Sequence, residues 1–114
     1  MSHYLCQVSY TTEAWEKLIK SPQNRFDIVR PAIEKLGGKV ETSYFAFGEY
    51  DAVLIMQMQD NVSAAAIAMA FAAGGSLKGV KTTPLLTAAE GLEAMKKAAG
   101  SGYKPVAKAA GAGR

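Results

Sequence analysis

The sequence has little of the chemistry that disulfides and most metal sites need. It contains one cysteine, Cys6, and one histidine, His3, among 114 residues. A single cysteine excludes an intramolecular disulfide, and a lone histidine leaves no Cys/His cluster with the spacing of a metal site. We therefore expect neither a metal nor another cofactor. The lack of a disulfide also fits a reducing compartment, so a cytoplasmic location is predicted.

Long apolar runs are missing as well. No segment approaches the roughly 18 to 20 apolar residues of a membrane span. The first residues, MSHYLCQV, lack the basic start and apolar stretch of a signal peptide, so we expect no membrane contact. Hydrophobic residues make up 49% of the chain, and its length suits one hydrophobic core but not two.

Net charge is absent from most of the chain. The formal charge is +3, and Lys104, Lys108 and Arg114 account for all of it, so residues 1–99 are neutral. A nucleic-acid-binding domain carries its basic surface on the fold, so nucleic acid is disfavoured as a partner. The last residues are rich in Gly and Ala, with too little apolar bulk to offset the entropy of ordering. We expect one domain over 1–99 and a flexible basic tail over 100–114.

The remaining patterns predict alternating strands and helices. Residue types that favour strands occur over 3–10, 39–46, 51–58 and 78–86. Helical spacing and capping residues predict helices after Thr11 or Thr12, from Ser21-Pro22 to Gly37-Gly38, over 62–73, and from the capping box at Thr87 to about residue 98. Pro84 cannot donate to a strand ladder, so the last strand should lie at a sheet edge.

This order of elements predicts a topology. Two right-handed crossovers place the main helices on one face of a four-stranded antiparallel sheet. The expected strand order is 4-1-3-2. The predicted fold is therefore α+β and ferredoxin-like (βαββαβ), with one extra helix at the C-terminal end.

The third predicted strand raises the question of self-association. Residues 52–56, AVLIM, are apolar on both faces of that strand, whereas a half-exposed strand should alternate. Because the main helices cover only one face, a second copy packed sheet against sheet in a two-fold dimer is the favoured cover. The alternative is that the last helix folds over the open face.

Three short motifs, together with the order of elements, resemble the GYD domain family. They are IKSP at 19–22, KLGGK at 35–39 and GEYD at 48–51, and the resemblance covers about residues 3–90. It implies a dimeric α/β-barrel within the ferredoxin-like folds, and hence a homodimer or larger homo-oligomer. The family is largely without an assigned activity. The wider barrel group includes cofactor-independent monooxygenases, small isomerases and ligand-sensing domains.

The GEYD turn has a functional and a structural interpretation. In the first, Tyr50 donates a hydrogen bond and Asp51 acts as a base or ligand anchor at a pocket mouth. In the second, Gly48 supplies the turn geometry with a positive φ, Asp51 accepts from backbone amides of the turn itself, and Tyr50 packs against a neighbour or another subunit. The structural interpretation is favoured, because any member of the fold needs a fixed turn for strand register.

Other side chains carry similar alternatives. His3 has an unperturbed pKa near neutrality and could move protons, but it lies near the end of the chain, where fraying is expected. Cys6 could be a nucleophile, although a cysteine within a strand is usually a small buried hydrophobe. Ordinary core packing competes with an aromatic pocket between sheet and helices for five residues: Trp15, Phe26, Tyr44, Phe45 and Phe47.

Three function classes follow, of which nucleic-acid association through the tail is the least favoured, because residues 1–99 carry no net charge. The favoured hypothesis is a non-catalytic ligand-binding or interaction module. The alternative is a small cofactor-independent enzyme, monooxygenase- or isomerase-like, acting on a small apolar molecule in a pocket between sheet and helices. The residues predicted to contact a ligand are Tyr50, Asp51, His3, Trp15 and Tyr44, and no catalytic residue is assigned.

Overall fold

The computed structural model describes residues 1–107, and residues 108–114 of the predicted tail lie outside the described part. Within it the chain forms, in order, β1 (Ser2–Tyr10), α1 (Thr12–Lys20), α2 (Phe26–Lys35), β2 (Lys39–Phe45), β3 (Ala52–Met58), α3 (Asn61–Ala73), β4 (Leu77–Leu85) and α4 (Ala88–Ala99). These bounds lie close to those expected from the sequence, except at the start of α2. Among the described residues, no helix is long and apolar enough to cross a bilayer.

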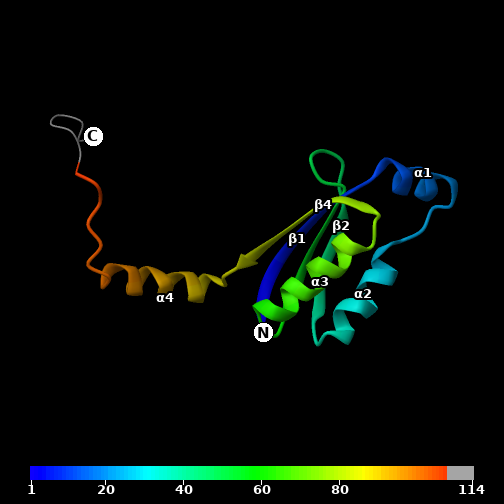
Figure 1. Ribbon diagram of the computed structural model, residues 1–114. Helices are drawn as coiled ribbons and strands as arrows, with labels where there is room; N and C mark the ends of the chain where they lie inside the picture. Colours follow the sequence, from blue (N-terminus) through cyan, green and yellow to red (C-terminus); the bar gives the residue numbers. More distant parts are fainter. Residues whose placement is uncertain (108–114) are drawn as a thin grey trace.

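The four strands form one antiparallel sheet in the order β2-β3-β1-β4 (Figure 1). This is the predicted ferredoxin-like order, with β1 and β3 central. Pro84 lies in β4 opposite Tyr4, on the edge strand where a missing backbone donor is tolerated. The ladder is irregular at two places, beside Tyr10 in β1 and around Glu41 in β2. The α+β class and the sheet topology are thus confirmed.

Helix starts follow the capping residues of the sequence, with one exception. The side chains of Thr11, Asp60 and Thr87 accept hydrogen bonds from the first turns of α1, α3 and α4. The second helix was expected to begin at Ser21-Pro22, but that prediction is wrong, because α2 begins at Phe26. Asn24 sets this start: its Oδ1 accepts from the Phe26 amide at 3.0 Å and its carbonyl accepts from the Asp27 amide at 3.1 Å.

The end of α2 shows why two glycines stand in a row. The Gly37 amide donates to the Glu34 carbonyl and the Gly38 amide to the Ile33 carbonyl, with Gly37 at φ +83°. This is the Schellman arrangement, in which a left-handed glycine closes the helix. A Cβ on Gly38 would lie 2.7 Å from the Gln57 carbonyl oxygen and 2.9 Å from Ile33 Cγ2. Gly38 therefore lets the helix end pack directly on β3.

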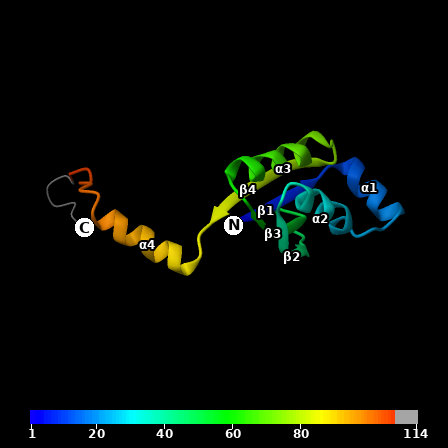
Figure 2. The ribbon, with the colours of Figure 1, turned by 90° about the horizontal axis from the view of Figure 1, so that it is seen from below.

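The core lies between the sheet and the helices α2 and α3, on the face of the sheet that both helices cover (Figure 2). In β3 the side chains alternate between buried and half-buried along the whole strand. The buried hydrophobic residues are Tyr4, Cys6, Tyr10, Phe26, Ile33, Ala52, Leu54, Met56, Met58, Ala64 and Ile67. Burying these side chains provides the main stabilisation of the fold.

The other face of the sheet is not covered within this chain. Its central apolar residues, Leu5, Val53 and Ile55, are half-buried; Leu5 pairs with Ile55 across β1 and β3, and Val53 pairs with Gln7. The helix α4 buries none of its residues and extends away from the sheet (Figures 1 and 2). The structure therefore does not place the last helix over the open face, which was the alternative to a dimer.

Candidate functional site

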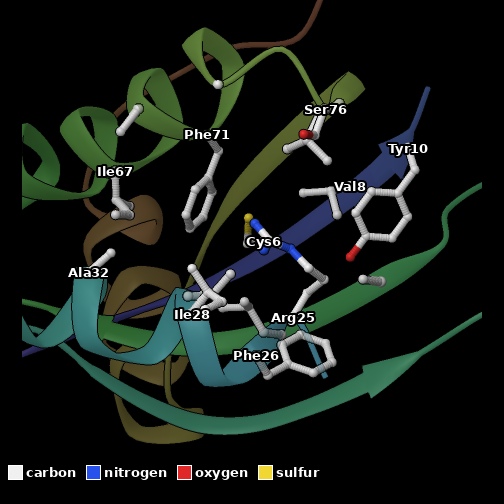
Figure 3. Close-up of a pocket in the computed structure, with 16 residues that line it drawn as sticks. Cys6, Val8, Tyr10, Arg25, Phe26, Ile28, Ala32, Ile67, Phe71 and Ser76 are labelled. Atoms are coloured by element: carbon white, nitrogen blue, oxygen red, sulfur yellow. The ribbon is translucent and has the colours of Figure 1, made fainter. Parts of the chain in front are cut away.

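A cavity of about 290 Å³ opens between α2, α3 and the sheet (Figure 3). Its floor is formed by β1 and β3, through Cys6, Val8 and Leu54. Its walls come from the two helices and from the start of β4. Beyond the three floor residues, the lining consists of Tyr10, Arg25, Phe26, Ile28, Val29, Ala32, Ala52, Ile67, Ala70, Phe71, Gly74, Ser76 and Leu77.

Small side chains explain why this space stays open. Ala32 on α2, and Ala70 with Gly74 at the end of α3, line the cavity and are exposed at its rim. The larger side chains that α3 turns toward the sheet here are Ile67 and Phe71, which point into the cavity in Figure 3. Alanine favours the helix but fills little volume. Ala70 and Gly74 of α3 therefore leave the rim of the cavity open, while Ile67 and Phe71 of the same helix form its wall.

Four polar groups line this otherwise apolar cavity. Cys6 lies on its floor, Arg25 at the start of α2 extends its side chain into it, and the Tyr10 hydroxyl points into the same space (Figure 3). Ser76 lies at the β4 end. An apolar cavity with a few convergent polar groups is the usual form of a small-molecule site.

Two titratable groups of the cavity lining, the Tyr10 phenol and the Cys6 thiol, are held in their neutral forms. Burial raises the pKa of the Tyr10 phenol; nearby Arg25 opposes the rise, and Asp51 adds to it. Burial also raises the pKa of the Cys6 thiol, against a smaller opposing effect of the Thr82 hydroxyl. A nucleophilic cysteine needs a lowered pKa. Cys6 is therefore part of the cavity floor and not an activated thiolate.

The GEYD turn lies at the end of the sheet beside Tyr10, and Asp51 ties it to β1. Asp51 Oδ2 accepts from the Tyr10 amide at 2.9 Å, and the Asp51 amide donates to the Val8 carbonyl at 2.8 Å. The Ser9 hydroxyl donates to the Glu49 carbonyl at 3.0 Å. These bonds fix the end of β1, where its pairing with β4 becomes irregular. The turn thus holds the backbone of Tyr10 in place through Asp51, while the Tyr10 side chain lines the cavity.

Gly48 does not have the conformation that the structural interpretation assumed. Its φ lies outside the left-handed region, and a Cβ there would meet nothing within 4 Å. The turn is held by the hydrogen bonds of its neighbours, so a positive φ is not what requires glycine here. Phe47, beside it, is 100% exposed, and Tyr50 is half-buried.

The five residues predicted to contact a ligand are spread over three places, and none lines the cavity. Tyr50 and Asp51 lie in the turn. His3 and Tyr44 lie on the open face of the sheet, where His3 Nε2 is 3.2 Å from Glu41 Oε1. Trp15 packs edge-on against Tyr10, with ring centroids 5.2 Å apart, so it touches the cavity only through that tyrosine.

The proposed aromatic pocket is only partly formed. Phe26 lines the cavity and packs against Phe45, with ring centroids 4.9 Å apart. Tyr44 and Phe47 are exposed. Sequence reasoning missed Arg25, Tyr10 and Phe71. Arg25 carried the clearest signal, since it is a cation directly beside the apolar stripe of a helix.

No group of three or more His, Cys, Asp or Glu side chains gathers as a metal site within residues 1–107. The cavity offers one cation, one phenol, one hydroxyl and one thiol. Such a set can hold and orient a small molecule through its apolar surface and a few hydrogen bonds.

Fold and cavity together define a small ferredoxin-like α+β domain with a cavity between its helices and its sheet. The sequence matches the GYD domain over residues 4–96. The chain therefore belongs to the GYD domain family, as its motifs indicated. No curated protein matches the sequence.

Solved structures share the fold at low sequence identity. MtbAldR superposes with a TM-score of 0.55 at 15% identity, over 75% of this chain and 53% of that one. TTHA0845 from Thermus thermophilus has a TM-score of 0.51 at 16% identity, and the match covers 77% of this chain and 96% of that one. FFRP-DM1 has a TM-score of 0.48 at 14% identity, and the match covers 75% of this chain and 100% of that one. This chain thus spans about half the length of MtbAldR, and the first two likenesses show a common fold.

Proposed function

We propose that this protein is a non-catalytic module that binds a small, largely apolar molecule in the cavity between α2, α3 and the sheet. The observation that carries the proposal is the cavity itself, open at the rim and lined mainly by aliphatic and aromatic side chains. An engineered apolar cavity of about 150 Å³ accepts benzene. At about 290 Å³, this one suits a ligand of roughly ten non-hydrogen atoms.

The chemistry of the polar groups favours binding over catalysis. The raised pKa values of Tyr10 and Cys6 keep both groups protonated near neutrality. A protonated phenol and thiol can donate hydrogen bonds, but they are poor bases and nucleophiles. Asp51 does not line the cavity, and its Oδ2 accepts from the Tyr10 amide, which favours a role in stabilising the turn over a role as a catalytic base.

Trp15 provides a built-in reporter for this proposal. It is the only tryptophan in the chain and contacts Tyr10 on the cavity floor. We expect 1-octanol to change its fluorescence saturably, with a Kd on the order of 0.1 to 1 mM for a ligand of this size. Ala70→Phe, at the cavity rim, should weaken binding at least about tenfold by occupying the space.

The matched control is Ala72→Phe. Ala72 lies on the same helix and is exposed, but it does not line the cavity. It should leave binding unchanged. Absence of saturable binding in the wild type, or equal loss in both variants, would contradict the proposal.

We also propose that the open face of the sheet is covered by a second copy, sheet against sheet in a two-fold dimer, as in the dimeric α/β-barrel that the family resemblance implied. The supporting observation is the uncovered centre of the sheet, Leu5, Val53 and Ile55, together with the placement of α4 away from it. Exposed apolar area of this kind marks interaction surfaces. In this arrangement His3 and Tyr44 contact the partner and not a ligand.

Light scattering at micromolar concentration tests the dimer. The wild type should have at least twice the monomer mass, and Ile55→Lys should shift it to the monomer. The control is Ile19→Lys, an exposed isoleucine of α1 that is 73% accessible, which should not change the mass. A wild type that is monomeric at all concentrations would refute this arrangement.

A further inference from the structure

Arg25 is an unusual residue in this cavity. It occupies the N-cap position of α2 and is half-buried. In Figure 3 its side chain extends past Phe26 into the cavity, and its charge is close enough to act on the Tyr10 phenol. The surrounding lining is almost entirely aliphatic and aromatic. A half-buried guanidinium beside apolar side chains loses part of its hydration, so an anion or hydrogen-bond acceptor there is favoured as its partner.

No carboxylate within the described part of the chain pairs with Arg25. The ion pair that forms there joins His3 to Glu41, on the opposite face of the sheet. The hydrogen bond of Arg25 Nη1 goes to Gln23 Oε1 at 3.5 Å, a long distance for a charged donor. Asp51 is the acid near this end of the cavity: it raises the pKa of Tyr10, whereas Arg25 lowers it. The Oδ2 atom of Asp51 already accepts from the Tyr10 amide.

The amides at the start of α2 do not provide a competing anion site. The Phe26 amide donates to the Asn24 side chain and the Asp27 amide to the Asn24 carbonyl. The next two amides, of Ile28 and Val29, donate to the Arg25 carbonyl. An anion in the cavity would therefore be held mainly by the Arg25 guanidinium, with the Tyr10 hydroxyl as a neutral donor on the same side.

We propose that the ligand of this cavity is an apolar monocarboxylate, with its carboxylate on Arg25 and its hydrocarbon part against Leu54, Ile67 and Phe71. This inference rests on the proposed ligand-binding function. A planar guanidinium matches a carboxylate in a two-point contact. Arg25 is the one cation of the cavity lining, and the negative charge of Asp51 lies close enough to act on Tyr10. One positive charge balances a ligand with one negative charge better than a ligand with two, which favours a carboxylate over a phosphate monoester. The volume fits about eight to ten carbon atoms.

Octanoate and 1-octanol separate the carboxylate from the hydrocarbon part. Both probes carry the same chain, and only octanoate is charged at pH 7. In a Trp15 fluorescence titration, we expect the wild type to bind octanoate about 10- to 100-fold more tightly than octanol. Arg25→Gln should remove this preference while changing octanol binding less than about threefold. Arg25→Lys should retain part of it, because the charge remains but the two-point geometry is lost.

Arg30→Gln is the matched control. Arg30 lies on α2, is exposed, and does not line the cavity, so this variant changes the net charge equally and should keep the full preference for octanoate. Equal binding of both probes by the wild type, or equal losses in both arginine variants, would overturn the carboxylate inference and leave the apolar cavity proposal intact. If neither octanoate nor 1-octanol bound the wild type, both the carboxylate inference and the apolar cavity proposal would be overturned. If Arg25→Gln fails to fold, the comparison of octanoate with 1-octanol on the wild type still tests the carboxylate inference.

Discussion

The two faces of the sheet differ although the same strands form both. On the helix-covered face, Met56 and Met58 of β3 are fully buried, with an exposed fraction of 0%. On the open face, their neighbours Val53, Ile55 and Gln57 remain half-buried in the single chain. The helix-covered face carries a cavity of molecular size, and the open face carries a small apolar centre, Leu5, Val53 and Ile55, that nothing in this chain covers. Alternation along one strand thus separates the proposed ligand site from the proposed contact with a second copy.

The largest expected effect contrasts two consecutive residues of β3. Met56→Ala should lower the free energy of unfolding by about 2–5 kcal/mol, because it leaves a cavity in a filled core. Ile55→Ala should cost about 1–2 kcal/mol in the monomer, because its side chain is only partly removed from water. Urea unfolding at low protein concentration measures both. Equal losses would mean that the two faces are equally buried even in the single chain.

Two glycines give the next contrast. Gly38→Ala should cost about 1–3 kcal/mol, because its Cβ would collide with the Gln57 carbonyl of β3 on the helix-covered side. Gly48→Ala should stay within about 0.5 kcal/mol of the wild type, since nothing surrounds that position. Denaturant unfolding checks both variants. A large loss for Gly48→Ala that appears only at high protein concentration would show that a second copy packs against the turn.

Asp51→Asn tests whether the turn is structural. The variant keeps the shape but weakens the charge-assisted bond to the Tyr10 amide, so we expect a loss of about 1 kcal/mol or less. Glu49→Gln, on an exposed residue of the same turn, is the control and should be neutral. Unfolding and octanoate binding are followed in parallel. Unchanged stability together with abolished binding would instead identify Asp51 as part of the ligand site.

The smallest effect is expected outside the sheet. Deleting residues 100–114 should change the free energy of unfolding by less than about 0.5 kcal/mol, because residues 100–107 are exposed and form no helix or strand. Thermal unfolding and light scattering of the truncated and full chains provide the measurement. A clear drop in melting temperature or in mass would show that the C-terminal residues pack, either on this chain or on a second copy.

Local chemistry in the sequence determined most of the fold. Strand and helix periods, a cap at Thr11 or Thr12, the capping box at Thr87 and the Gly37-Gly38 helix end were readable because each depends on neighbours within a few residues. The rules for crossovers then left one sheet order, which the structure has. The start of α2 was misplaced because the helix begins after Asn24, whose side chain accepts from the Phe26 amide and whose carbonyl accepts from the Asp27 amide, and not at Ser21-Pro22.

The candidate site was decided only by the tertiary structure. Cys6, Arg25 and Phe71 are far apart in the sequence, and only the packing of α2 and α3 on the sheet brings them around one space. Whether small residues such as Ala32 and Ala70 leave a gap depends on how far apart the helices sit, which no local pattern contains. The turn residues Tyr50 and Asp51 stood out in the sequence, yet the geometry gives Asp51 a backbone partner. The sequence by itself therefore determined the topology and the family, because both follow from local periodicity and motif order. The tertiary structure alone decided which side chains meet, because that depends on contacts between residues distant along the chain.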